Sequence, residues 1–162
     1  MKPENVMPKD RVLFVIHDNE ISGSTKFQKY GFLLWKQYQK ELEKIASVHE
    51  RLAFYDDWRP HYYGPFSEGL QKDIAVCIKS GLLHKSKGRG LKLEVYRLTL
   101  KGRVRWRKFF TDGEYHGEMK KIEDKIRNLQ NIRYYTLLRQ IYKEYPSYAK
   151  NSKIKDLVLN HP

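Results

Sequence analysis

The residues that could perform catalysis or bind a metal are few and far apart in the sequence. Asp56 and Asp57 are adjacent, and in an extended segment their side chains point to opposite faces, which makes a poor metal pair. The six histidines show neither His-x-His nor His-x-x-x-His spacing, and "KGRG" lacks the Gly-Lys-Ser/Thr ending of a phosphate-binding loop. The sequence therefore predicts no metal site, no cofactor and no enzyme.

The only cysteine, Cys77, falls on the apolar stripe of an expected helix together with Leu70, Ile74 and Ile78. We expect a buried, unreactive thiol there. A single cysteine forms no internal disulfide, which fits a reducing compartment. The start "MKPENVMPKD" lacks the apolar core of a signal peptide, and no run of about eighteen apolar residues occurs. These features predict a cytoplasmic protein without a membrane partner.

Positive charge is concentrated in one segment of the chain. Between Lys79 and Lys108 there are eleven Lys or Arg residues and one acid, Glu94, whereas the rest of the chain is close to neutral. This segment, called the basic block below, accounts for most of the formal charge of +13 and the pI near 9.7. Such an excess favours a polyanionic partner, and nucleic acid is the usual one for a basic globular chain. A solvated face that serves only solubility is the alternative.

Periodicity and capping residues indicate the elements that carry these charges. Ser67 and Thr99 are expected helix caps, and Gly81 lies where a helix ends. The expected elements are helices over 8–19, 26–45 and 68–80, an extended aromatic segment over 52–66, a hairpin over 81–99, helices over 100–110 and 115–145, and a short last helix after Ser152.

This order predicts a fold that is mainly α with a small β hairpin (α+β), namely a winged helix-turn-helix plus a C-terminal helical extension. We assign residues 1–112 to the winged-helix domain and 113–162 to the extension. In a winged helix, the helix before the hairpin faces the DNA major groove and the hairpin tip reaches phosphates. The positive tip "KSKGRG" suits that task.

Two short motifs stand out in the first half of the chain. The first consists of Gly23, Thr25, Lys26, Gln28 and Lys29, and the second of Tyr63, Gly64, Pro65, Phe66 and Ser67. They resemble motifs of small archaeal and bacterial winged-helix proteins related to the Panacea (SocA-like antitoxin) domain. The resemblance covers about residues 12–102, implies a winged-helix fold, and suggests as an alternative function a protein-interaction module that binds a protein partner. The basic block is a departure from the antitoxin relatives.

The preferred hypothesis is a double-stranded DNA-binding protein that acts as a transcriptional regulator or a nucleoid-associated protein, with RNA as an open alternative. Third-helix residues would read bases, and cations elsewhere would contact phosphates. The candidate DNA-binding residues are Ser67, Gln71, Lys72 and Lys79 on the third helix; Lys85, Lys87, Arg89, Lys92 and Arg97 on the hairpin; Lys101, Arg105 and Lys108 on the next helix; and Lys26 and Lys29 at the start of the second helix.

The last long helix carries an apolar series, Met119, Ile122, Ile126 and Leu129, at alternating steps of three and four. We expect this face to meet its two-fold mate in a homodimer that spans neighbouring half-sites. The alternative is that the series packs against its own chain.

Overall fold

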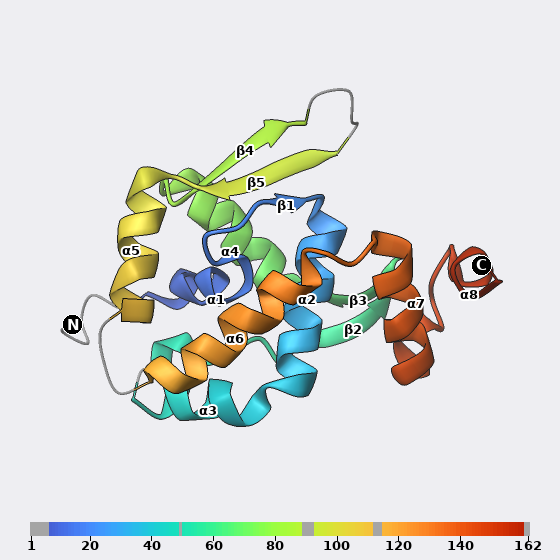
Figure 1. Ribbon diagram of the computed structural model, residues 1–162. Coiled ribbons are helices and arrows are strands. Elements are labelled where there is room, and N and C mark those ends of the chain that lie inside the picture. The colour runs from blue at the N-terminus through green and yellow to red at the C-terminus, as the bar shows by residue number, and fades with distance from the viewer. Residues whose placement is uncertain (1–6, 49, 89–92, 112–114, 161–162) are drawn as a thin grey trace.

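Helices make up most of the computed structural model, which describes residues 7–48, 50–88, 93–111 and 115–160 and also contains two small antiparallel sheets (Figure 1). This confirms the predicted class, mainly α with a small β component. The first half contains η2 (Pro8–Val12), α1 (Leu13–Ile16), β1 (Ile21–Ser22), α2 (Ser24–Gln37), α3 (Gln39–Val48), η3 (Glu50–Leu52), β2 (Trp58–His61) and β3 (Gly64–Ser67). The second half contains α4 (Glu68–Lys79), β4 (Leu83–Lys87), β5 (Glu94–Leu98), α5 (Leu100–Thr111), α6 (His116–Leu129), α7 (Tyr134–Glu144), η4 (Pro146–Ala149) and α8 (Lys155–Asn160).

The larger sheet has the strand order β1-β5-β4. Strand β1 lies between α1 and α2 in the sequence, and Ile21 pairs with Tyr96 at the centre of the sheet. Leu83 and Leu98 pair at the base of the β4–β5 hairpin. Strand β1 thus adds a third strand to the β4–β5 hairpin, at the edge opposite β4. The second sheet, β2–β3, is an insertion between α3 and α4.

The predicted helix over 26–45 is two helices in the structure, α2 and α3, which meet at Tyr38. The Tyr38 backbone (φ −125°, ψ 32°) leaves the helical region, and no Pro or Gly marks the break. Eight consecutive residues of α2, from Phe27 to Leu34, are buried. A helix that is buried on all sides occupies the centre of a fold, and α1, α4, α6 and α7 all contact it.

The predicted helix over 115–145 is also two helices, α6 and α7. The side chains of Met119, Ile122, Ile126 and Leu129 are at most 4% exposed, because α6 lies across α1, α2 and α3 of the same chain (Figure 1). The Tyr30 hydroxyl donates a hydrogen bond to the Leu129 carbonyl at 3.3 Å. The prediction that this face meets a second copy is therefore wrong, since its own chain already covers it.

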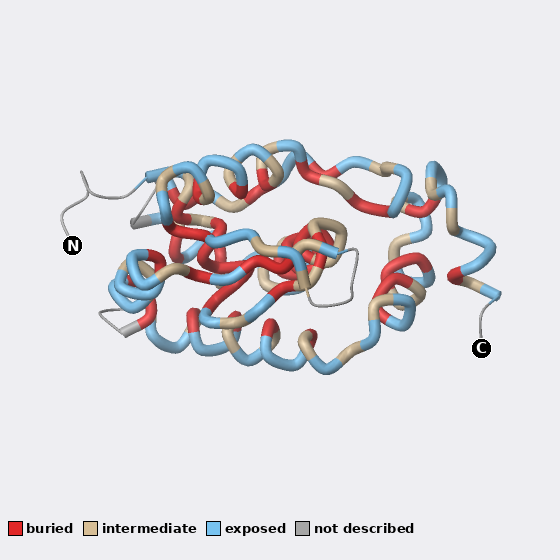
Figure 2. Tube along the Cα trace, turned by 90° about the horizontal axis from the view of Figure 1, so that it is seen from above, coloured by how far each residue is buried: buried red, intermediate tan, exposed pale blue. Residues whose placement is uncertain are grey.

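One hydrophobic core runs through the molecule, and Figure 2 shows the buried segments gathered in its interior. The core extends from Val12 to Val158, so the residues assigned to the extension fill the same interior as those of the winged-helix domain. Of the helices in the described ranges, none combines the length and the apolar character that crossing a bilayer requires.

Gly102 lies where α5 packs against the turn between α4 and β4. A Cβ atom at this position would be 2.1 Å from the Leu82 carbonyl oxygen. That oxygen also accepts hydrogen bonds from the Thr99 backbone N–H at 3.0 Å and the Thr99 hydroxyl at 3.3 Å, so it moves only if these bonds are strained.

We expect Gly102→Ala to lower the free energy of unfolding by about 1–3 kcal/mol, because the added methyl overpacks the contact between two backbones. Gly117→Ala is the matched control, since nothing lies within 4 Å of a Cβ there and alanine raises helix propensity by up to about 1 kcal/mol. Urea titration followed by circular dichroism measures both variants. Equal effects at the two positions would contradict the packing argument.

Candidate nucleic-acid interface

The C-terminal end of α4, the base of the β4–β5 hairpin and the N-terminal end of α5 meet at one point. Gly81 has φ +77°, a conformation that glycine adopts without strain, and it turns the chain sharply out of α4. The Lys101 ammonium of α5 donates to the Ser80 carbonyl at 2.8 Å. Lys101 is therefore brought next to Ser80 and the preceding Lys79, although it is far from both in the sequence.

Seven of the predicted DNA-binding cations are exposed on these three elements, and we call them the basic set. In α4, Lys72 and Lys79 point outward, and the side chain of Lys72 is 74% exposed. The members are Lys72, Lys79, Lys85, Lys87, Arg97, Lys101 and Lys108. Arg89 and Lys92 were predicted to complete the tip and lie outside the described residues. Exposed cations on neighbouring elements are what sequence-independent phosphate binding needs.

Acids from the segment before α2 pair with arginines of the basic block, a feature that the sequence did not reveal. The pairs are Glu20–Arg97 (2.9 Å), Asp18–Arg103 (3.0 Å) and Asp10–Arg105 (2.5 Å). The first two pairs are about half exposed and contribute little to stability in water. Arg97 can therefore exchange its acid for a phosphate at low cost.

The Asp10–Arg105 pair differs because Asp10 is fully buried. The guanidinium binds both carboxylate oxygens, with the Nε–Oδ1 distance at 2.8 Å. The hydrogen bonding of the guanidinium to the Asp10 carboxylate raises the pKa of Arg105. Removing one partner of such a pair leaves an uncompensated charge, so Arg105 holds α5 against η2. Its prediction as a DNA contact is wrong for this fold.

Two predicted base readers on α4 face inward. Ser67 is fully buried and caps α4, since its hydroxyl accepts a hydrogen bond from the Leu70 N–H at 3.0 Å and donates one to Asp57. It cannot reach a base, so that prediction is wrong. Gln71 is half-buried, with its carbonyl oxygen 3.4 Å from the Gln28 amide nitrogen. The outward side of α4 consists of Glu68, Lys72, Ala75, Val76 and Lys79.

The two lysines at the start of α2 have different environments. Lys29 is 2% exposed, and its ammonium donates to the Pro65 carbonyl at 3.0 Å. Burial lowers the pKa of Lys29 to about 7. Because duplex phosphates cannot reach it, its prediction as a DNA contact is wrong. Lys26 is partly exposed, with its nitrogen 6.0 Å from the centre of the Tyr30 ring, and it stays a candidate.

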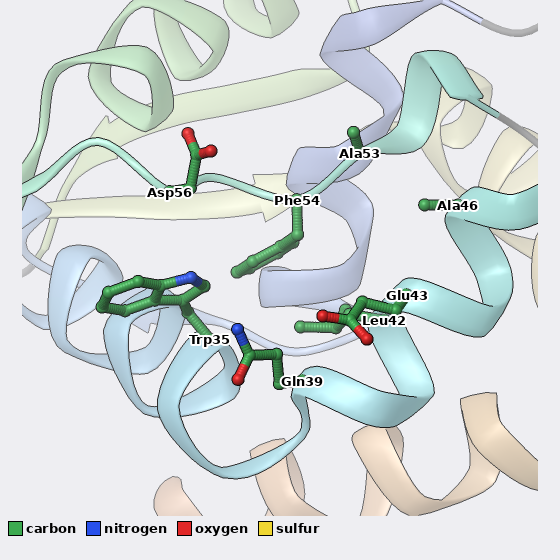
Figure 3. A pocket seen from close by; sticks show the side chains of 8 residues that line it. All are labelled: Trp35, Gln39, Leu42, Glu43, Ala46, Ala53, Phe54 and Asp56. Atoms are coloured by element: carbon green, nitrogen blue, oxygen red, sulfur yellow. The ribbon is translucent and has the colours of Figure 1, made fainter.

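Sequence reasoning missed two pockets that described residues line. The first, of about 220 Å³, lies between α2, α3 and the segment after η3, with Trp35, Leu42 and Phe54 as apolar walls (Figure 3). Its charged groups are the exposed carboxylates of Glu43 and Asp56. The second, of about 210 Å³, lies between the first turn of α2, the β2–β3 turn and α4. The sequence signal that could have pointed to the second pocket is the pair of polar residues Gln28 and Lys29 beside the apolar residues of α2.

Within the described ranges, no three His, Cys, Asp or Glu side chains lie close enough together to hold a metal ion. Cys77 is fully buried, as predicted, and burial raises the pKa of its thiol to about 12. It is therefore a protonated thiol at neutral pH, and the thiolate is the nucleophilic form.

Comparisons with protein-family models, curated proteins and solved structures find no match to this chain. The resemblance to Panacea-related proteins stays a prediction. Inference about function therefore depends on the geometry and charge of the described residues.

Proposed function

We propose that the protein binds double-stranded DNA through α4 and the basic set, as a transcriptional regulator or a nucleoid-associated protein. The main support is the position of Lys79 and Lys101 next to Ser80, where α4, α5 and the base of a basic hairpin come together. A helix followed by a positively charged hairpin suits a major groove flanked by two phosphate backbones.

The outward side of α4 would lie in the major groove. Ala75 and Val76 are exposed there, with Val76 at 45%, and small apolar side chains of this kind contact the thymine methyl group. Lys72 and Lys79 flank them and can reach base edges or phosphates. Lys72 lies 3.8 Å from Glu68, but both side chains are more than 60% exposed, so this pair opposes DNA binding only weakly.

We expect duplex DNA to bind with an affinity whose logarithm falls linearly with the logarithm of salt concentration, by about 0.9 per phosphate contact. Lys79→Ala and Lys87→Ala should each reduce this slope by about 0.9, because neither lysine forms an ion pair with a described residue. Mobility-shift titration at several salt concentrations measures the slope.

The matched control is Lys143→Ala, which removes an exposed cation from α7, at the opposite end of the molecule from α5 (Figure 1). It should leave the slope unchanged. Absence of duplex binding at low salt, or an equal loss in the control, would contradict the proposal. Tighter binding of duplex RNA or single-stranded DNA in the same titration would show that this nucleic acid, and not duplex DNA, is the preferred ligand.

A second candidate function, a module that binds a protein partner, is favoured by the β2–β3 turn. Tyr62 and Tyr63 are adjacent there and are 51% and 44% exposed. Tyrosine is enriched in protein interfaces, and the Lys153 ammonium already lies 4.1 Å from the centre of the Tyr62 ring. If duplex DNA does not bind, this surface becomes the better candidate.

A further inference from the structure

The pocket between α2, the β2–β3 turn and α4 contains a buried positive charge with incomplete hydrogen bonding. The Lys29 ammonium has three N–H donors, and among the described residues the Pro65 carbonyl is its one acceptor. No described carboxylate forms an ion pair with it. A buried ammonium is costly unless its charge is compensated, so the fold leaves room for an acceptor that the chain does not supply.

The other groups around the pocket favour a negative charge. Ser24 and Thr25, in the first turn of the fourteen-residue helix α2, line it, and no side chain caps that end of the helix. Free backbone N–H groups and the helix dipole make such an end attractive to anions. His61 lines the opposite side, and its pKa is lowered by partial burial and by the nearby Arg59 and Lys29 charges. The lining includes no Asp or Glu.

The amide of Gln28 is already committed to the fold. It donates to the Ser67 carbonyl at 3.0 Å and accepts from the Ser67 N–H at 2.8 Å, which fixes the start of α4. Gln71 of α4 lies beside it, with its side-chain oxygen 3.4 Å from the Gln28 nitrogen. The donors available to an occupant are the Lys29 ammonium and the first turn of α2, together with the side chains of His61, Tyr63 and Gln71 along the lining.

We propose that this pocket binds a small oxyanion, a phosphate, sulfate or carboxylate group, through the Lys29 ammonium and the first-turn N–H groups of α2. The volume of about 210 Å³ suits a free anion or a small metabolite that carries one, and excludes a duplex. The site does not depend on DNA binding. Its occupant would contact Gln28 of α2, which fixes the start of α4, and Gln71 of α4 itself.

Thermal unfolding of the full chain tests the site, with sodium phosphate, sulfate or acetate added against sodium chloride of matched ionic strength. A specific ligand raises Tm with saturation at its site, whereas general salting-in or salting-out effects do not saturate. Lys29→Met removes the charge and keeps the length of the side chain. Lys26→Met removes one charge from the same helix end, outside the pocket, and is the matched control.

We expect at least one oxyanion to raise the Tm of the parent and of Lys26→Met in a saturable way. Its affinity for Lys29→Met should be at least tenfold lower. The most effective anion then separates phosphate from carboxylate as the preferred group. Equal stabilisation of all three proteins, or none beyond chloride, would overturn the proposal. If Lys29→Met does not fold, amide NMR of the parent decides: phosphate-dependent shifts at Ser24 and Thr25 support the site, and their absence overturns it.

Discussion

Ile122→Glu is expected to unfold the protein or to leave it barely stable. Ile122 is fully buried in the hydrophobic core, on the face of α6 that lies against α1, α2 and α3. Burying an uncompensated charge costs several kcal/mol, and total stabilities are about 5–15 kcal/mol. Circular dichroism and urea titration should show loss of the cooperative transition, and Ile126→Glu should behave in the same way.

Asn128→Glu is the matched control, because Asn128 lies on the exposed side of the same helix. It introduces the same side chain and should change the free energy of unfolding by no more than about 0.5 kcal/mol. A folded, stable, monomeric Ile122→Glu protein would show that this face of α6 is an interface between copies instead of part of the core.

Acidification is expected to destabilise the fold through His17. The imidazole is 1% exposed, and its Nδ1 accepts a hydrogen bond from the Trp106 indole N–H at 3.3 Å, which requires that Nδ1 carry no proton. Burial, with a smaller contribution from Arg127, lowers the pKa of His17 to about 3. A protonated Nδ1 would instead point its proton at the indole N–H.

The pKa values of His17 in the folded and unfolded states determine how the free energy of unfolding changes with pH. The unfolded chain binds this proton below pH about 6.5, whereas the folded chain binds it only near pH 3. The stability contributed by neutral His17 is therefore fully present above pH 6.5 and is lost as the pH falls, by about 1.4 kcal/mol per unit, or about 2 kcal/mol at pH 5. Lys29, whose pKa is about 7 in the folded state and 10.5 in the unfolded chain, adds a smaller loss that lies above about pH 6, so the decline from pH 6 to pH 5 is due chiefly to His17.

Urea titrations at pH 5, 6 and 7 measure the effect, and His17→Gln provides the comparison. Glutamine does not titrate, so the variant should lose most of the decline between pH 7 and 5, whatever its stability at pH 7. If the parent and the variant decline in parallel, His17 is not the group responsible.

Elements with local signals were predictable from the sequence. Helix α4 begins after the Ser67 cap and ends before Gly81, as expected. The β4–β5 hairpin and the Thr99 cap of α5 were also found, because a glycine-rich basic turn and a capping hydroxyl are read within a few residues. Once these elements were assigned, the exposed positions of their cations could be predicted as well.

Features that depend on distant residues were not predictable. The apolar stripe of α6 showed that one face is buried but not whether its own chain or a second copy covers it. The breaks at Tyr38 and after Leu129 have no Pro or Gly to mark them. The pairing of Asp10 with Arg105 joins residues 95 positions apart. Long-range packing decided each of these cases, and also buried Lys29.

The central position of α2 sets the order of events during biosynthesis. Tyr30 of α2 contacts Leu129 of α6, 99 residues later in the chain. Ribosomes add about 5–20 residues per second, so roughly 5–20 s separate the synthesis of the two. During that interval the nascent chain carries an apolar helix without its cover, a state in which chaperone binding protects against aggregation. Folding is therefore expected to finish only after α6 has left the ribosome.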